Sequence, residues 1–287
     1  MKEKRLAGAA LYHIIIFAIG IIMVYPLIWM VMSSFKETNT IFTTASSLIP
    51  EHFVTDNYAN GWKGFAKISF STFFKNSIFI SVIATIGTIA SSAVVAYGFA
   101  RFKFRGKGIL FSAMLLSMML PAQVLMIPQY LWYQKLGWVG SFLPLTVPYF
   151  FAIQGFFVYL LSNFIGGIPI ELDEAAKIDG ANAVQTFFKI TLPYMLFVMT
   201  PYLITQFTGN INNFNVIFLL SGGNPTPVDA TAGKTDLLVT WLYKLTVDKN
   251  YYNLGAVIGI MTFIVLAIVA LVTYRNTASY KDEEGFM

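Results

Sequence analysis

Three side-chain amides within one hydrophobic stretch are the residues best suited to bind a ligand. Gln206, Asn210 and Asn213 are spaced at i, i+4 and i+7, so a continuous helix would place them on one face. An amide both donates and accepts hydrogen bonds, and several on one face suit a ligand rich in hydroxyl groups. Hydrogen bonding between helices explains the pattern equally well, because amides need partners inside a bilayer. Gln154 and Phe156 in the preceding stretch are weaker candidates, as a polar contact and a stacking surface.

A polar interruption between two hydrophobic stretches is the second candidate site. It covers residues 166–193 and reads GGIPIELDEAAKIDGANAVQTFFKITLP. Pro169 can begin a helix, and the acidic residues that follow suit the positive end of a helix dipole. Gly180 predicts the end of this helix, since glycine readily adopts the left-handed conformation. With a second short helix expected at about 183–190, the segment forms a surface that another protein can bind.

Hydrophobic stretches on both sides must position these residues. The chain has 287 residues, of which 56% are hydrophobic and 11% charged, whereas a soluble domain has about 25% charged residues. Most of the chain must therefore face lipid or other apolar helices. We predict an all-α polytopic membrane protein that forms a single transmembrane domain over residues 1–287. Six stretches each reach the roughly 20 residues that a spanning helix needs; they lie at about 9–32, 73–100, 108–130, 142–164, 194–220 and 254–274.

The basic residues predict the orientation in the membrane. Six spans place both termini on one side, and the positive-inside rule makes that side cytoplasmic. The segment 166–193 then also faces the cytoplasm. The residues that carry this argument are Lys2, Lys4, Arg5, Arg101, Lys103, Arg105, Lys107, Arg275 and Lys281. An N-terminal run of this length, with no small-residue cleavage site after it, is expected to be a retained span and not a signal peptide.

Several classes of function are disfavoured by composition. The chain has no cysteine, which excludes thiolate metal sites and disulfides, and no metal site or catalytic group is expected. The predicted spans contain almost no ionisable side chains, which argues against a carrier driven by protons or sodium. No basic face on a soluble scaffold is available for nucleic acid. The stretch Ala232-Gly233-Lys234-Thr235 resembles the end of a P-loop, but the earlier glycine that the motif requires is replaced by Val228.

Within residues 166–193, fixed positions match a known motif. They are Glu174, Ala175, Ala176, Gly180, Ile190, Leu192 and Pro193. This spacing resembles the EAA loop of permease subunits of bacterial ATP-binding cassette importers. The resemblance implies that the loop contains the coupling helix, which docks into a cleft on a separate ATPase subunit. It assigns ATPase coupling to these positions together with Asp179.

The resemblance extends over essentially the whole chain. Up to about Pro193 the chain resembles the smaller permease subunit of carbohydrate importers, including the stretches AYGFARFKFRGKG and MLPAQVLMIPQY. From about Tyr194 onward it resembles the larger permease subunit of the maltose/maltodextrin type, including NINNFNVIFLLSGGNP. In that subunit the asparagine-rich stretch lines the sugar site, which implies Asn210 and Asn213 here. A recombined or designed chain is consistent with this mixture.

The resemblance implies a bacterial inner-membrane permease for a maltodextrin-like oligosaccharide, with no cofactor of its own. ATP and magnesium would be used by two cytoplasmic ATPase subunits. The other implied partners are a homologous permease subunit in a heterodimer, an extracytoplasmic sugar-binding protein at the loops around 33–72 and 221–253, and membrane lipid. Alternatives are an importer for another oligosaccharide or a glycerol phosphate, an ion-driven carrier or channel, and a membrane anchor without transport.

Overall fold

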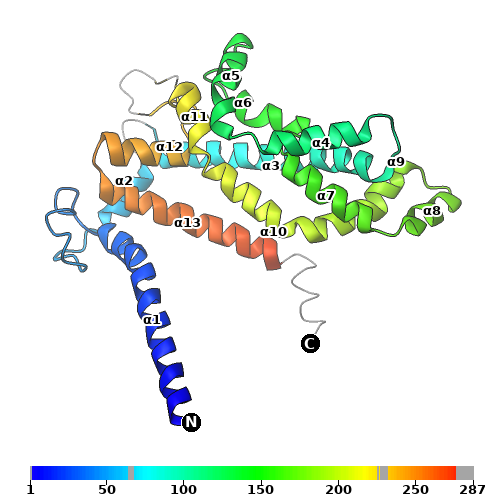
Figure 1. Cartoon of the computed structure of the whole chain (residues 1–287). Coiled ribbons are helices and arrows are strands. Elements are labelled where there is room, and N and C mark those ends of the chain that lie inside the picture. Colours follow the sequence, from blue (N-terminus) through cyan, green and yellow to red (C-terminus); the bar gives the residue numbers. More distant parts are fainter. Residues whose placement is uncertain (1, 64–67, 225, 227–231, 276–287) are drawn as a thin grey trace. The chain divides into compact units, whose positions relative to one another are not determined.

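The computed structural model describes residues 2–63, 68–224, 226 and 232–275, without the side chains of 2–11, 122, 123, 196–198, 200 and 201. Every regular secondary-structure element along these residues is a helix, which confirms the all-α fold (Figure 1). Four helical segments in this part of the chain are long and apolar enough to cross a membrane. They are Tyr12–Ser33, Phe70–Arg101, Leu143–Gly167 and Tyr252–Arg275.

The chain divides into two compact units. The first comprises Met1–Phe70 and Leu242–Ile264, and the second comprises Ser71–Trp241 and Val265–Met287. The helices that lie wholly or mostly in the first unit are α1 (Lys2–Ser33), α2 (Asp56–Lys63), the π-helix η3 (Lys244–Asp248) and α13 (Tyr252–Arg275). The last of these continues into the second unit.

The polar segment after α1 folds around a buried lysine. Lys36 is only 2% exposed, and its Nζ donates hydrogen bonds to the carbonyl oxygens of Thr44 and Ser47 at 2.9 and 2.7 Å. An ammonium group can be buried only when it is paired or hydrogen-bonded. The hydrogen bonds from Lys36 to these two carbonyl groups therefore hold the loop after α1, which has no helix or strand, in a defined conformation.

The second unit contains the two candidate sites. Its helices in chain order are α3 (Phe70–Arg101), α4 (Lys107–Met118), α5 (Ala122–Lys135), α6 (Leu143–Thr146), the 3-10 helix η1 (Val147–Phe151), α7 (Gly155–Gly167), α8 (Ile170–Ile178), α9 (Ala183–Thr186), the π-helix η2 (Phe187–Thr191), α10 (Leu192–Ile211), α11 (Phe214–Ser221) and α12 (Leu238–Tyr243). The first residue of α3 and the end of α12 belong to the first unit.

Helices α3, α7 and α10 pack together in the second unit. Their apolar cluster joins Ala93 and Ala96 of α3 to Leu161 of α7 and to Met195 and Met199 of α10. Small residues on α3 let the larger side chains of its neighbours approach closely, as is common in membrane helices. The cluster fixes α3 against the helices on either side of α8 and α9.

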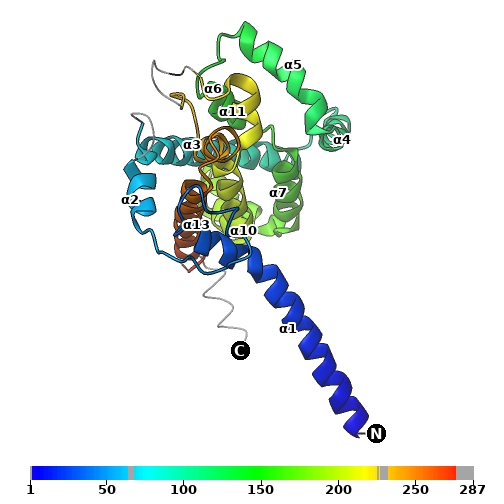
Figure 2. The ribbon, with the colours of Figure 1, turned by 90° about the vertical axis from the view of Figure 1, so that its left-hand side faces the viewer.

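Three of the predicted spans are interrupted. The stretch 142–164 is divided into α6 with η1 and then α7, with no helix at residues 152–154. The stretch 108–130 is divided into α4 and α5, because Pro121 takes an extended conformation as the N-cap of α5 (ψ 131°). In Figure 2, α4 is seen almost end-on, whereas α5 runs across the view, so the two helices point in different directions. The stretch 194–220 is divided into α10 and α11 at Asn212 and Asn213. The division of the chain into six spans stays a prediction.

Candidate functional site

Helix α8 lies where the sequence predicts the first helix of residues 166–193. Pro169 is its N-cap, and Gly180 follows it with a φ of 81°. The N–H of Gly180 donates to the carbonyl of Lys177 at 3.0 Å, and that of Ala181 donates to the carbonyl of Ala176 at 2.8 Å. The turn therefore satisfies carbonyl groups at the helix end by means of a residue that readily adopts positive φ.

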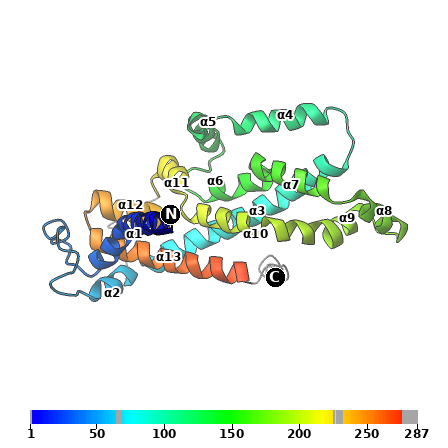
Figure 3. The same cartoon turned by 60° about the horizontal axis from the view of Figure 1, so that its bottom comes forward.

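The second helix differs from the prediction. Instead of one helix at about 183–190, α9 passes through η2 into α10 without a break. A capping box begins it: the Gln185 N–H donates to Asn182 Oδ1 at 2.8 Å, and the Asn182 N–H donates to Gln185 Oε1 at 2.9 Å. An Asn followed three residues later by Gln is a recognisable start signal that the prediction missed. Figure 3 shows α8 beside the end of the long α9–η2–α10 helix.

The predicted coupling residues are mostly on the surface. Glu174, Ala175, Asp179, Gly180 and Pro193 are exposed, whereas Ala176, Ile190 and Leu192 are partly buried. Large apolar side chains stand among them that the motif does not include. Ile178 is 86% exposed, Val184 63% and Phe188 59%. Exposed apolar side chains on a polar segment make this segment a candidate surface for binding another protein.

An arginine far away in the sequence holds α8 in place. Arg101 Nε lies 2.8 Å from Asp173 Oδ2, and the two side chains are 8% and 7% exposed. The contact is an ion pair, since the Nε–H does not point at the carboxylate closely enough to make a hydrogen bond. Arg101 Nη2 also donates to the carbonyl of Ile168 at 3.0 Å. From the sequence, Arg101 is expected only to help set the orientation in the membrane, and its contact with α8 is not predicted.

The three amides do not share one helix face. Helix α10 ends at Ile211, so Asn213 lies beyond it, and the prediction from i+7 spacing is wrong for this residue. Asn210 is 4% exposed, and its Nδ2 has no hydrogen-bond partner among the described residues. Gln206 is partly buried on the same helix. The break occurs because Asn213 takes a non-helical conformation (ψ 81°) and begins α11 as its N-cap.

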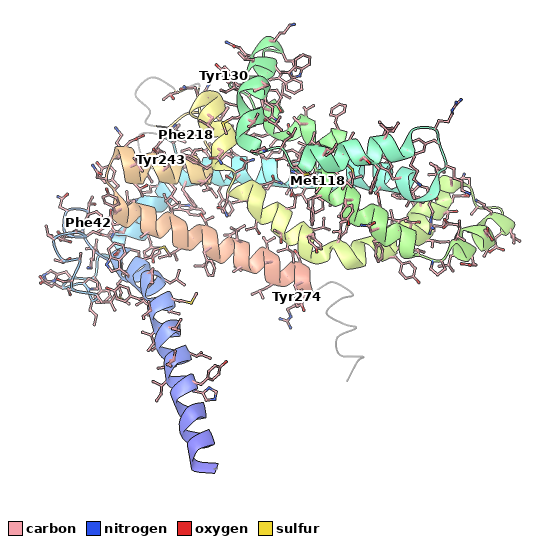
Figure 4. The ribbon with its side chains drawn as sticks, in the orientation of Figure 1. Phe42, Met118, Tyr130, Phe218, Tyr243 and Tyr274 are labelled. Atoms are coloured by element: carbon pink, nitrogen blue, oxygen red, sulfur yellow. The ribbon has the colours of Figure 1, made fainter. Side chains whose placement is uncertain are left out.

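Asn213 lines a cavity of about 380 Å³ between α5 and α11. A cavity of this size lies within the range of small-molecule sites, roughly 300–1,000 Å³. The Tyr133 hydroxyl can both donate and accept hydrogen bonds. The lining residues are Met126, Ile127, Gln129, Tyr130, Tyr133, Asn213, Asn215, Val216, Leu219 and Leu220. Figure 4 labels Tyr130 on α5 and Phe218 on the neighbouring α11.

The other ligand candidates lie elsewhere. Gln154 is the N-cap of α7, and its carbonyl accepts from the N–H of Phe157 at 3.0 Å. Phe156 is 44% exposed, with its ring centroid 5.9 Å from that of Tyr202. Neither residue lines the cavity. The structure thus brings Asn213 to a cavity and leaves Gln154 and Phe156 outside it.

The stretch that resembles a P-loop is folded on itself. Its Thr235 is buried and donates through Oγ1 to the carbonyl of Asn224 at 2.7 Å. The N–H of Gly233 donates to Oδ2 of the fully buried Asp236 at 2.7 Å. A phosphate-binding loop needs such N–H groups to point at the ligand. This arrangement supports a structural role for the loop.

Comparisons with known proteins agree on one family. Residues 90–278 match the model of the binding-protein-dependent transport system inner membrane component. The galactooligosaccharides transport system permease protein GanP of Bacillus subtilis is 41% identical over 51% of this chain and 32% of GanP. This chain therefore spans about a third of the length of GanP. The diacetylchitobiose uptake system permease protein NgcG of Streptomyces coelicolor is 32% identical over 97% of this chain and 89% of NgcG.

A solved structure has the same fold. It is a bacterial ABC transporter involved in the import of the acidic polysaccharide alginate, with a TM-score of 0.78 and 20% identity over 96% of this chain and 98% of that chain. The likeness confirms the polytopic all-α membrane fold. The chain belongs to the family of binding-protein-dependent transport system inner membrane components.

Proposed function

We propose that the chain is the permease subunit of an ATP-driven importer and forms part of the pathway for a neutral, maltodextrin-like oligosaccharide. The observation that carries this proposal is the cavity between α5 and α11. Its polar lining comes from two asparagines, a glutamine and two tyrosines, with apolar side chains between them. Amides and phenols can pair with sugar hydroxyls, and aromatic rings offer flat surfaces to the apolar faces of sugar rings.

Helix α8 and the turn after it supply the coupling surface in this proposal. Ile178 and Val184 would enter a cleft on a cytoplasmic ATPase subunit, together with the exposed positions of the motif. Removing such side chains from water stabilises a complex by about 1.5–3 kcal/mol each when burial is complete. ATP and magnesium then act on the ATPase subunits, and the chain itself carries out no chemical step.

The remaining partners follow from the same proposal. Two ATPase subunits would serve a pair of homologous permeases, of which this chain is one. An extracytoplasmic binding protein would deliver the sugar to the loops around 33–72 and 221–253. Both termini would lie in the cytoplasm, in agreement with the basic residues near them.

An acidic or phosphorylated substrate is a second candidate that the cavity disfavours. Such a ligand would call for arginine or lysine side chains near its anionic groups. None of the residues that line the cavity is charged. The names of GanP and NgcG refer to neutral oligosaccharides, and such sugars fit this uncharged lining better than a glycerol phosphate does.

The test is a transport complex assembled in membranes. The chain is co-expressed with candidate ATPase, permease and binding-protein partners, and ATP hydrolysis is measured with a panel of sugars. We expect stimulation by binding protein loaded with a neutral oligosaccharide. An ATPase that assembles but responds only to an anionic solute would overturn the substrate class. If no ATPase assembled with any pair of permeases, the coupling assignment would fail.

A further inference from the structure

Helix α3 is anchored at its C-terminal end to the joint between α7 and α8. Arg101, the last residue of α3, pairs with Asp173 of α8 at 2.8 Å and donates to the carbonyl of Ile168 at 3.0 Å. Ile168 is the C-cap of α7, so one guanidinium group contacts both sides of the turn that leads into α8. This double contact sets the direction in which α8 leaves α7.

The pair matters energetically because both charges are buried. Asp173 is 5% exposed, and its Oδ1 has no hydrogen-bond partner in the described part of the chain. A buried carboxylate without hydrogen bonds depends on the positive charge beside it. Removing Arg101 therefore favours movement of Asp173 toward water, and α8 would have to turn for that to happen.

The opposite end of α3 is anchored to the polar loop before α12. Asn76 Nδ2 donates to the carbonyls of Lys234 and Asp236, at 3.1 Å each. Ser77 Oγ accepts from the N–H of Leu238 at 3.0 Å. The ring of Phe73 stacks on Trp241, with centroids 4.9 Å apart and an interplanar angle of 16°.

Between these two anchors α3 is one continuous helix of 32 residues. At 1.5 Å per residue its axis is about 48 Å long, enough to cross a bilayer. It contains no proline, and proline is a common cause of sharp kinks. Its C-terminal part packs against α7 and α10, and Ile80 nearer its start packs against Leu145 of α6 and Ile217 of α11.

We propose that α3 is a rigid strut between the coupling helix α8 and the loop at residues 232–238, with Arg101 as the positioning residue that attaches α8 to it. A movement of α8 imposed by an ATPase would then be transmitted along α3 to the loop on the other side. The inference rests on the proposed function, since it assigns the route by which that coupling reaches the far side. Its structural part, the positioning of α8 by Arg101, can be tested without any partner.

The first experiment measures the position of α8 directly. The chain has no cysteine, so Val94→Cys on α3 and Ile178→Cys at the end of α8 can each carry a spin label. Both positions are exposed, at 66% and 86%. We expect a narrow distance distribution in the parent chain and a broad or displaced one with Arg101→Gln. The control is Arg105→Gln, which removes an exposed arginine four positions later.

The second experiment measures coupling in the assembled complex. In complexes that still contain the ATPase, we expect Arg101→Gln to lower the stimulation by loaded binding protein, relative to basal hydrolysis, about tenfold, as for loss of an allosteric link. Arg101→Lys keeps the charge and should restore part of the stimulation. If Arg101→Gln does not fold, Arg101→Lys replaces it in both experiments. A distance distribution like that of the parent chain, together with reduced stimulation, would then contradict the proposal.

The outcomes separate this inference from the proposed function. If Arg101→Gln gives the parent distance distribution and the parent stimulation, Arg101 does not position α8 and the inference is overturned. If the parent chain binds no ATPase, the proposed function fails, and the distance measurement still decides whether Arg101 holds α8.

Discussion

Asn253 Nδ2 donates a hydrogen bond to Asn57 Oδ1 over 3.0 Å, although the two residues are 196 positions apart in the chain. Asn57 in turn donates through Nδ2 to the carbonyls of Ser34 and Lys36, at 2.8 and 2.9 Å. Asn253 also accepts from Thr38 Oγ1 at 3.1 Å. Two amides thus connect the first turn of α13 to α2 and to the loop that follows α1.

Replacing Asn253 with Leu should destabilise the first unit. The change leaves buried Asn57 Oδ1 without its donor, and an unsatisfied buried group costs about 1–3 kcal/mol. We expect a lower midpoint of thermal unfolding in detergent. The matched control is Asn60→Leu, since Asn60 lies on the exposed side of α2. Equal midpoints for the two variants would show that the amide network contributes nothing to stability.

Gly180 should tolerate no branched residue without loss of ATPase binding. Its φ is 81°, and no atom lies within 4 Å of the position that a Cβ would take, so any penalty comes from the backbone alone. A left-handed conformation costs a β-branched residue about 1–2 kcal/mol, and proline cannot adopt it. Gly180→Val and Gly180→Pro should therefore reduce co-purification of the ATPase.

The control for this prediction is Gly166→Ala. Gly166 has equally open surroundings, but it lies inside α7 with no positive φ. If Gly166→Ala reduced ATPase recovery as much as Gly180→Val does, the positive φ of Gly180 would not be the cause of the reduced recovery.

The sequence predicts those features that depend on neighbouring residues. Pro169 and Gly180 bound α8 within a few positions of the predicted ends, because a helix begins and ends through local backbone chemistry. The long apolar stretches are recognised because hydrophobicity sums over many residues. The Asn182–Gln185 capping box is also local, and its spacing is visible in the sequence.

The remaining features depend on positions far apart or on a single backbone torsion. Arg101 and Asp173 are brought together by the packing of α3 against α7, which no periodicity reveals. The prediction of a shared amide face assumes a continuous helix. The non-helical conformation of Asn213 changes the direction in which the chain continues after it. A hydropathy window averages over such a break, just as it does at Pro121.

Asn213→Leu and Asn210→Leu should have different effects. Asn213 lines the cavity, so its loss should raise the sugar concentration needed for half-maximal stimulation of ATP hydrolysis about tenfold, the effect of losing one hydrogen bond worth about 1.5 kcal/mol. Asn210 is buried, so its replacement should mainly alter stability or assembly. The measurement is the sugar concentration needed for half-maximal stimulation, together with the yield of the complex. If Asn210→Leu shifted that concentration and Asn213→Leu did not, the sugar site would lie at α10 instead of the cavity.

Ile178→Glu should weaken the complex with the ATPase without unfolding the permease. The side chain is 86% exposed, so the isolated chain loses almost no packing when it is replaced. In the proposed complex it is buried, and losing about 1.4 kcal/mol raises the dissociation constant about tenfold. The measurement is ATPase retained on immobilised permease at a series of ATPase concentrations. Ile49→Glu is the control, because Ile49 is also a surface isoleucine, 65% exposed, in the polar segment after α1. Comparable loss with both variants would indicate a general effect of added charge, whereas loss with Ile178→Glu alone would place the ATPase at the end of α8.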